Sequence, residues 1–294
     1  SYLDEMIKLY DTKKFPKVLL LNGKKGIGKF TLTMHFINYI YSKNEKTSYN
    51  IKNKSINVNS LFYSLLLNKT TQDVIFIQAE ESKNIKIDDV RSLKYILSNS
   101  SLSNNPRFIV IDEVEFLNNN SINALLKTLE EPSENNFFIL INNQQADLIK
   151  TISSRCLKSN IFLNTSEINK VINYLVESRD IDNLLDLNND ITPGLFIRFN
   201  EIFLKYQINK NDDMYIIINK LLNTFKKNKD KILIYLCFFL IDQFFLKLVQ
   251  KKENKLDYLL TIKTSINKNI NDFIFFNLNI NSVLNSIEVK LKNV

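Results

Sequence analysis

The residues best suited to chemistry lie in a glycine-rich stretch near the start of the chain. The segment GKKGIGKF (residues 23–30) follows an apolar run, Val18–Leu21, and nearly matches the phosphate-binding pattern G-x-x-x-x-G-K-[ST]. A glycine-rich loop between a buried strand and a helix turns its backbone N–H groups inward and forms an anion cradle. The residues that we expect to bind nucleotide here are Gly23, Gly26, Gly28 and Lys29.

The last position of this segment departs from the pattern. A Ser or Thr hydroxyl normally holds a magnesium ion there, but the residue is Phe30, whose ring offers no oxygen. Thr31 is the nearest hydroxyl, yet one helical step turns a side chain about 100° around the helix. We therefore expect ATP or ADP to bind weakly or not at all, with impaired magnesium binding and little or no hydrolysis. The alternative is that Thr31 replaces the missing hydroxyl at the nucleotide site.

A second set of chemical groups follows a later apolar strand, Arg107–Ile111, which ends in Asp112 and Glu113. An Asp at the end of such a strand can hold magnesium through water, and the adjacent Glu can orient an attacking water. The glycine loop and this acidic pair together are a specific indication of a nucleotide site, whereas the acidic pair alone is weak.

Apolar strands alternate with helices in the first part of the chain, which predicts an α/β fold with a parallel sheet covered on both faces. The expected strands are 17–21, 73–77, 107–111, 136–141 and 160–163. The expected helices around them are 3–10, 29–41, 87–97 and 118–131. After residue 163 we expect only helices, over 166–177, 181–187, 214–225, 230–249, 256–268 and 281–291.

The composition limits the classes of protein that the chain can belong to. Its length of 294 residues predicts two or three domains. It has 39 Lys and Arg residues against 31 Asp and Glu residues, and the resulting net charge of +8 suits a polyanionic partner. An A/T-rich coding bias would produce the same excess of lysine. Two distant cysteines and one histidine argue against a disulfide framework, a zinc module and a Ser-His-Asp mechanism. The apolar stretch 232–249 contains charged residues, so we expect a buried helix and no membrane span.

Three segments occur in an order that resembles the AAA+ subunits of bacterial clamp loaders: LLLNGKKGIGK, FIVIDEVEFLNNNSINALLKTLEEP and TISSRC. Within that family the chain is most similar to the delta-prime class of DNA polymerase III subunits, and LLKTLEEP and S-R-C are the most specific parts. The likeness is strong over residues 15–160 and architectural beyond them. It implies a P-loop AAA+ domain over 1–163, a small helical lid domain over 164–205 and a helical collar domain over 206–294.

The resemblance also implies roles for single residues. Arg155, in S-R-C, matches an arginine that the family extends to the ATP of a neighbouring subunit, where a guanidinium can be worth about 10³–10⁵ in rate. Asn142 matches a polar position that orients water near the terminal phosphate. Arg91 matches a position that touches DNA phosphate in related subunits. The alternatives are an ordinary surface ion pair for Arg155 and a solvated helix face for Arg91.

Three departures from the family matter, and the first two of them favour a subunit that does not hydrolyse ATP. Besides Phe30, the segment Thr192-Pro193-Gly194 lacks an arginine that active members carry there, and the zinc-binding cysteines of many relatives are missing, so we expect no bound zinc. One hypothesis is a stator that lends Arg155 to a neighbour. The other is a gamma/tau-like motor that hydrolyses ATP itself. A small-molecule P-loop kinase is a weaker third, because it leaves S-R-C unexplained.

The partners that the resemblance implies are gamma/tau-like and delta-like subunits, with the sliding clamp and primer–template DNA reached through the complex. We expect a cytoplasmic protein. The rings of Phe238, Phe239, Phe244 and Phe245 supply more apolar surface than an isolated helical bundle readily hides, which predicts that other subunits cover part of it.

Overall fold

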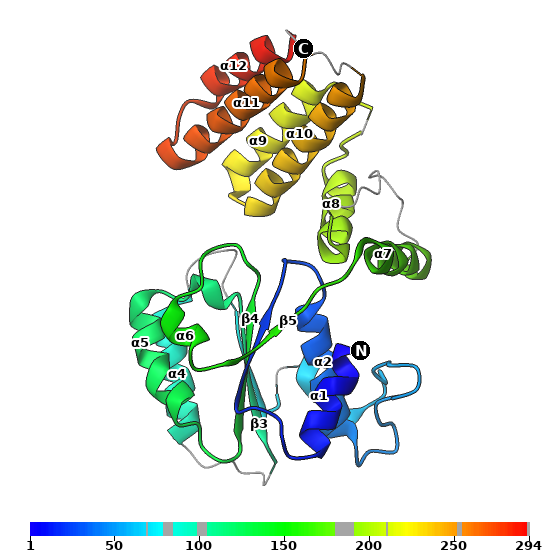
Figure 1. The fold of residues 1–294 in the computed structure, drawn as a ribbon, viewed down its shortest axis with the longest axis vertical. Coiled ribbons are helices and arrows are strands. Elements are labelled where there is room, and N and C mark those ends of the chain that lie inside the picture. Colours follow the sequence, from blue (N-terminus) through cyan, green and yellow to red (C-terminus); the bar gives the residue numbers. More distant parts are fainter. Residues whose placement is uncertain are drawn as a thin grey trace. The chain divides into compact units, whose positions relative to one another are not determined.

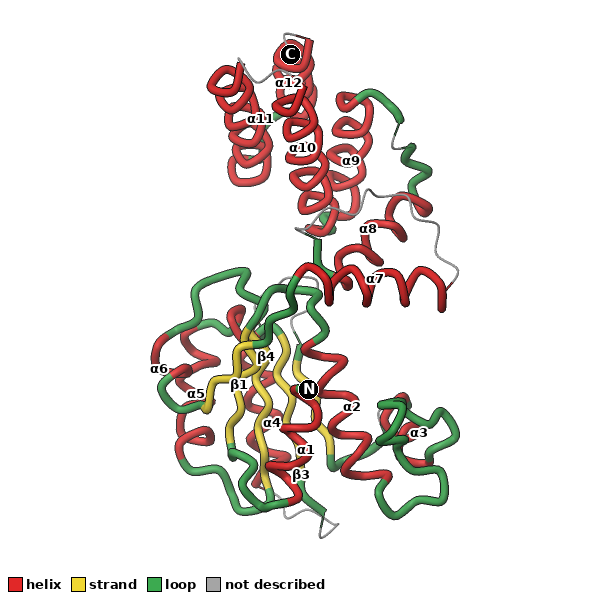
Figure 2. The backbone as a smooth tube through the Cα atoms, turned by 45° about the vertical axis from the view of Figure 1, so that its right-hand side comes forward, coloured by secondary structure: helices red, strands yellow, loops and turns green. Residues whose placement is uncertain are grey.

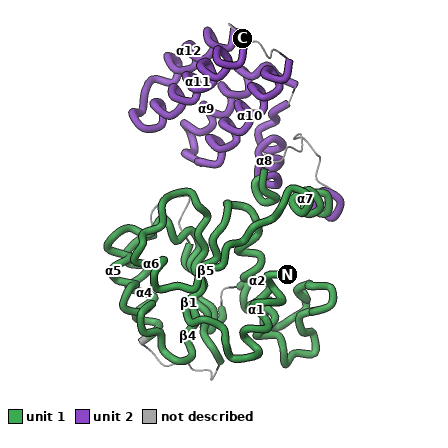
Figure 3. Tube along the Cα trace, in the orientation of Figure 1, with its two compact units in different colours: residues 1–174, 188–195 green, residues 175–187, 196–294 purple. Residues whose placement is uncertain are grey.

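The computed structural model describes residues 1–68, 70–78, 85–98, 105–179, 191–209, 211–251 and 255–292. The chain divides into two compact units (Figure 3), which are Ser1–Tyr174 with Asn188–Leu195 and Leu175–Leu187 with Phe196–Val294. The helix expected over 181–187 lies outside the described residues. The domain boundaries expected near 163 and 205 stay predictions.

Parallel strands form the core of the first unit (Figure 1), and their order across the sheet is β2-β3-β4-β1-β5. The strands are β1 (Val18–Asn22), β2 (Val74–Ile77), β3 (Arg107–Asp112), β4 (Asn136–Asn142) and β5 (Leu157–Asn160). Every residue of β1 and β3 is buried, as expected for strands covered on both faces. This arrangement confirms the predicted α/β fold with a parallel sheet.

Helices cover both faces of this sheet (Figures 1 and 2). Alternate residues of β1 point to opposite sides. Leu19 and Leu21 pack in one apolar cluster with Phe36, whereas Leu20 packs in another with Leu125. The helical elements of this region are α1 (Tyr2–Asp11), α2 (Lys29–Ser42), α3 (Leu61–Leu67), α4 (Ile87–Ser98), the 3₁₀ helix Val114–Phe116, α5 (Asn119–Glu130) and α6 (Lys150–Ser153).

Several elements differ from the sequence prediction, among them the helices over Lys150–Ser153 and Pro193–Lys205, which were not expected. The fifth strand is Leu157–Asn160, whereas we expected it over 160–163. Among the described strands it pairs with β1 alone, and it is mostly exposed. Its sequence Leu-Lys-Ser-Asn has no apolar run, whereas Ile161–Leu163 just after it does, and that run led to the expected strand. The short helix α3 was not predicted because it follows a long polar stretch. Its N-cap is Ser60, whose side chain accepts a hydrogen bond from the Tyr63 backbone amide.

The rest of the described chain is helical. It comprises α7 (Thr165–Arg179), α8 (Pro193–Lys205), α9 (Met214–Asn228), α10 (Lys231–Lys251), α11 (Leu256–Phe276) and α12 (Ile280–Lys292). In the second unit, α10 packs against α9 and α11, and α12 packs against the same two helices. This bundle confirms that the C-terminal region is helical, with α11 longer than predicted, and its role as a collar stays a prediction.

The helix α10 is long and apolar enough to cross a membrane by length and composition, which the core helix of a soluble bundle also satisfies. Within the bundle its Asp242 pairs with Lys263 of α11 at 2.7 Å. Of the four phenylalanines singled out from the sequence, Phe245 is buried, and the rings at positions 238, 239 and 244 are half-buried. That other subunits cover these rings stays a prediction.

Candidate functional site

The glycine-rich loop connects β1 to α2 and contains two residues with left-handed backbone angles. Gly26 has a φ of +79°, and Gly28, the N-cap residue of α2, has a φ of +99°. Glycine adopts these angles without the steric cost that a side chain brings. The loop follows the carboxyl end of a parallel strand, which is where α/β sheets bind ligands. The loop therefore lies between a buried strand and a helix, as the sequence predicts, and its action as an anion cradle stays a prediction.

The lysine of the loop points back into the loop itself. The Lys29 ammonium donates hydrogen bonds to the carbonyl oxygens of Gly23, at 2.7 Å, and Lys24, at 2.8 Å. The side chain is buried, and this burial lowers the pKa of Lys29 to about 8, although the nearby charge of Asp112 acts in the opposite direction. As folded, Lys29 stabilises the loop carbonyls and does not extend toward a phosphate position.

The segment Thr192-Pro193-Gly194 is bonded to the same loop. The Thr192 hydroxyl donates to the carbonyl of Lys25 at 2.7 Å, and the Gly194 amide donates to the carbonyl of Gly26 at 2.8 Å. The two glycines touch so closely that a Cβ on Gly194 would lie 2.8 Å from the Gly26 Cα. Both belong to the first unit. The start of α8 thus fixes residues 25 and 26 of the loop.

Phe30 is the second residue of α2 and lies on its exposed side. Its side chain is 39% exposed and lies against Phe76 of the edge strand β2, with 5.8 Å between the ring centroids. The ring provides no oxygen for a metal ion, as expected from the sequence. Thr31 is also exposed, on the next step of the helix. Its proposed contact with nucleotide stays a prediction.

The acidic end of β3 is brought close to the loop, as the sequence predicts. Asp112 is buried, and this burial raises the pKa of its carboxyl. Its Oδ1 accepts hydrogen bonds from the Glu113 amide, at 2.8 Å, and from the Asn143 side-chain amide, at 3.1 Å. A second buried acid, Glu115, accepts bonds from the backbone amides of Asn143 and Gln145.

Glu113 is paired with a loop residue. Its backbone φ is +58°, and its Oε1 forms a 2.8 Å ion pair with the Lys25 ammonium. The side-chain amide of Gln145 donates to the same oxygen at 3.3 Å. The glutamate that would orient an attacking water is therefore held by two side chains of its own fold.

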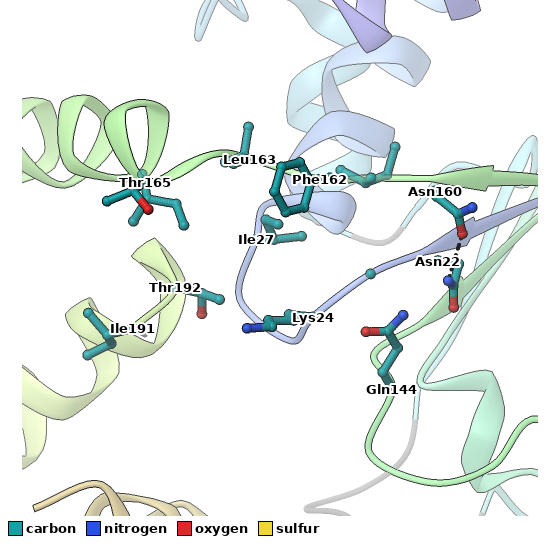
Figure 4. A pocket seen from close by; sticks show the side chains of 13 residues that line it. Asn22, Lys24, Ile27, Gln144, Asn160, Phe162, Leu163, Thr165, Ile191 and Thr192 are labelled. Carbon is teal, nitrogen blue, oxygen red and sulfur yellow. Dashed lines mark hydrogen bonds between the residues drawn. The ribbon is translucent and has the colours of Figure 1, made fainter. Parts of the chain in front are cut away.

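Three asparagines at the same level of adjacent strands form a ladder of side-chain bonds. Asn22 of β1 is in register with Asn142 of β4 and Asn160 of β5. The Asn142 amide donates to Asn22 at 2.8 Å, and the Asn22 amide donates to Asn160 at 2.8 Å, the bond drawn in Figure 4. Asn142, which we expected beside the terminal phosphate, thus belongs to the ladder, and its neighbour Asn143 contacts Asp112.

A cavity of about 330 Å³ lies beside the glycine loop (Figure 4). Apolar side chains contribute most of its wall, with polar groups at Lys24, Gln144 and Thr192. Its lining comes from the ends of β1 and β5, the glycine loop, the turn after β4, the residues after β5, the start of α7 and the residues before α8.

The two arginines of interest lie on the surface. Arg155 follows α6, its side chain is 31% exposed, and its bonds go to Glu130, Thr151 and Ser154. Arg91 lies on α4, is exposed and pairs with Asp88 at 3.3 Å. Neither role that the resemblance implies is tested by these contacts.

Sequence reasoning missed several groups that complete the site. Lys25, Glu115, Asn143 and Glu130 all pair with predicted residues or with their neighbours. Each lies within three residues of a motif position, and this proximity in sequence is what could have indicated that they belong to the site. The groups of three or more acidic, histidine or cysteine residues that would suit a metal ion do not occur among the described residues.

Comparison with known proteins places this chain among DNA polymerase III subunits. The model of the family described as DNA polymerase III, delta subunit, matches residues 1–164. The chain is 32% identical over 164 residues to DNA polymerase III subunit gamma of Buchnera aphidicola subsp. Acyrthosiphon pisum, which covers 55% of this chain and 43% of that protein.

Two relatives named subunit delta' are similarly close. The protein of Pseudomonas aeruginosa is 31% identical over 140 residues, 47% of this chain and 41% of its own length. That of Buchnera aphidicola subsp. Schizaphis graminum is 27% identical over 185 residues, 62% of this chain and 53% of its own. The chain spans about half the length, or less, of these curated relatives.

Proposed function

The chain belongs to the DNA polymerase III delta subunit family of bacterial clamp-loader proteins, and on this premise we propose that it is a delta-prime-like stator of a clamp loader. In this proposal it occupies a fixed place beside gamma/tau-like and delta-like subunits in the cytoplasm. The assembly opens a sliding clamp and places it on primed DNA. The chain contributes Arg155 to the ATP site of a neighbouring subunit and hydrolyses little or no ATP itself.

The state of its own nucleotide site carries this proposal. The Lys29 ammonium is bonded to loop carbonyls, Glu113 is paired with Lys25, and Phe30 replaces the hydroxyl that would hold magnesium. A magnesium–nucleotide would have to break the first two contacts and would still lack one metal ligand. The residues present therefore do not fit magnesium–ATP, and we derive no hydrolytic step in this subunit.

The guanidinium of Arg155 is the group that would act in another subunit. Its side chain is partly exposed on the surface, where a neighbour can reach it. A guanidinium placed against the charge that develops on a transferred phosphoryl group stabilises the transition state. Because Arg presents a planar fork that Lys lacks, the charge alone does not suffice.

An ATP-hydrolysing motor of the gamma/tau type is the second candidate. Two observations favour it: gamma and tau subunits are among the relatives, and Lys29, Asp112 and Glu113 are all present at the same end of the sheet. ATP turnover by the isolated chain, compared with Lys29→Ala, separates the two proposals. Robust turnover that depends on Lys29 would support the motor.

The stator is tested in the reconstituted complex with its gamma/tau-like and delta-like partners. Arg155→Ala and Arg155→Lys should each lower DNA-stimulated ATP turnover by at least tenfold, because both remove the guanidinium fork. The melting temperature of the isolated chain should change little, since exposed ion pairs stabilise weakly. Turnover that equals that of the unchanged complex would refute the role of Arg155.

A contact of Arg91 with DNA is a further part of the proposal. The side chain is exposed on α4, and its pair with Asp88 is at the surface and weak. Arg91→Ala should weaken DNA binding by the complex evenly across sequences and reduce its salt dependence, as loss of one phosphate contact does. ATP turnover at saturating DNA should stay the same.

A further inference from the structure

The guanidinium of Arg155 is fully engaged by its own chain. Its Nε donates to Glu130 Oε1 at 2.7 Å, and its Nη2 contacts the same oxygen. Its Nη1 donates to the Thr151 carbonyl at 2.8 Å and lies 3.4 Å from the Ser154 hydroxyl. The edge formed by Nε and Nη2, which is the edge that grips a two-oxygen anion, is therefore occupied by Glu130.

The place of Glu130 in the fold is not explained by helix stability. It is the last residue of α5, where the helix dipole disfavours a negative charge. The basic residue of that turn is Lys127, and the partner of Glu130 comes from another element, 25 residues further along the chain. The carboxylate is thus better accounted for by Arg155 than by its own helix.

We propose that Glu130 is a positioning residue that holds Arg155 until the terminal phosphate of a neighbour's ATP replaces it. A phosphate oxygen can take the place of the Glu130 oxygen that both Nε and Nη2 contact, because each is an anionic acceptor of charge-assisted hydrogen bonds. Exchange of one for the other leaves the Nη1 contact with Thr151 in place, so the side chain keeps its anchor. No covalent bond changes in this step. The inference rests on the proposed role of Arg155 in another subunit.

Replacement of the Glu130 carboxylate by a phosphate has a low free-energy cost because both side chains of the pair are accessible to solvent. Arg155 is 31% exposed and Glu130 is 44% exposed. Exposed ion pairs of this kind shift an equilibrium by a factor of about two to five. Glu130 therefore weakens the binding of the phosphate to Arg155 by about that factor. Before assembly it still holds the guanidinium in one orientation.

The isolated chain provides the first test. Nuclear magnetic resonance of the arginine Nε–H groups should show solvent exchange at Arg155 about two- to fivefold slower than in Glu130→Ala and equal to that in the matched control Glu131→Ala. Glu131 is the adjacent exposed acid, so both variants lose one charge at the same end of α5. Exchange at the same rate in the unchanged chain and in Glu130→Ala would overturn the proposal.

The reconstituted complex provides the second test. Glu130→Gln should lower the KM for ATP by about two- to fivefold with kcat within a factor of two, and Glu131→Gln should change neither. A kcat that falls as in Arg155→Ala, or an unchanged KM, would overturn the exchange. If Arg155→Ala leaves turnover unchanged, the proposed function fails, and the resonance experiment still decides whether Glu130 holds Arg155.

Discussion

Substitution of Gly194 by alanine tests the contact between the glycine loop and the start of α8. A Cβ at position 194 would lie 2.8 Å from the Gly26 Cα and 2.9 Å from the Gly26 carbonyl oxygen. Both are backbone atoms, which cannot rotate away as a side chain does. The loop or the start of α8 must therefore move, and the 2.8 Å bond between the Gly194 amide and the Gly26 carbonyl should be lost.

The expected size follows from two opposing effects. Overpacking of a close contact costs about 1–3 kcal/mol. Alanine in place of glycine favours a helix by up to about 1 kcal/mol, and by less at the second residue of α8. We therefore expect Gly194→Ala to lower the free energy of unfolding by roughly 1–2 kcal/mol. For a unit of this size, each kcal/mol lowers the melting temperature by about 2–4 °C.

Thermal melting and hydrogen exchange at the Gly194 amide are the assays. Gly28→Ala is the matched control: nothing lies within 4 Å of its added Cβ, but its φ of +99° strains any side chain. Both variants should melt earlier, and only Gly194→Ala should speed exchange at the Gly194 amide. If Gly194→Ala melts at the unchanged temperature with the amide still protected, the close contact does not exist in solution.

Three further predictions concern the same region. Burial lowers the pKa of Lys29 from 10.5 to about 8, so between these pH values the unfolded chain binds more protons than the folded chain. The free energy of unfolding, measured in urea melts, should therefore rise from pH 8 to pH 10 in the unchanged chain relative to Lys29→Met. Phe30→Thr should not restore tight magnesium–ATP binding in calorimetry, since Lys29 stays bonded to the loop. A Kd below 10 μM, which corresponds to a binding free energy of about −7 kcal/mol, would contradict this. Asn22→Leu leaves Asn142 and Asn160 without their ladder partner and should cost about 1–3 kcal/mol in denaturant melts, whereas an unchanged midpoint would show that the ladder contributes nothing.

The sequence was sufficient for elements with a strong apolar pattern. The strands β1 and β3 are buried at every residue, so their apolar runs marked them clearly. The edge strand β5 has the sequence Leu-Lys-Ser-Asn and is mostly exposed, so hydrophobicity gave no indication of it. A strand at the edge is specified by its pairing with β1, which a local pattern does not contain.

Within the site, the proximity of the loop and the acidic pair followed from the rule that parallel strands end at the same edge. The pairing of side chains did not. Whether Asn142 or Asn143 faces Asp112 depends on how the chain turns after β4, where Gln144 has a φ of +56°. The pairs of Arg155 with Glu130 and of Lys25 with Glu113 join distant segments, so they required the fold.

The contact between Gly26 and Gly194 has a consequence for how this sequence can diverge. The chain contains only 4 glycines, and 2 of them meet each other across 167 intervening residues. A methyl group on either one collides with the backbone of the other segment, so neither position is free to drift while its partner stays. Replacing the partner residue does not relieve either collision, because backbone atoms are met on both sides, so both positions should remain glycine as long as the two segments stay bonded.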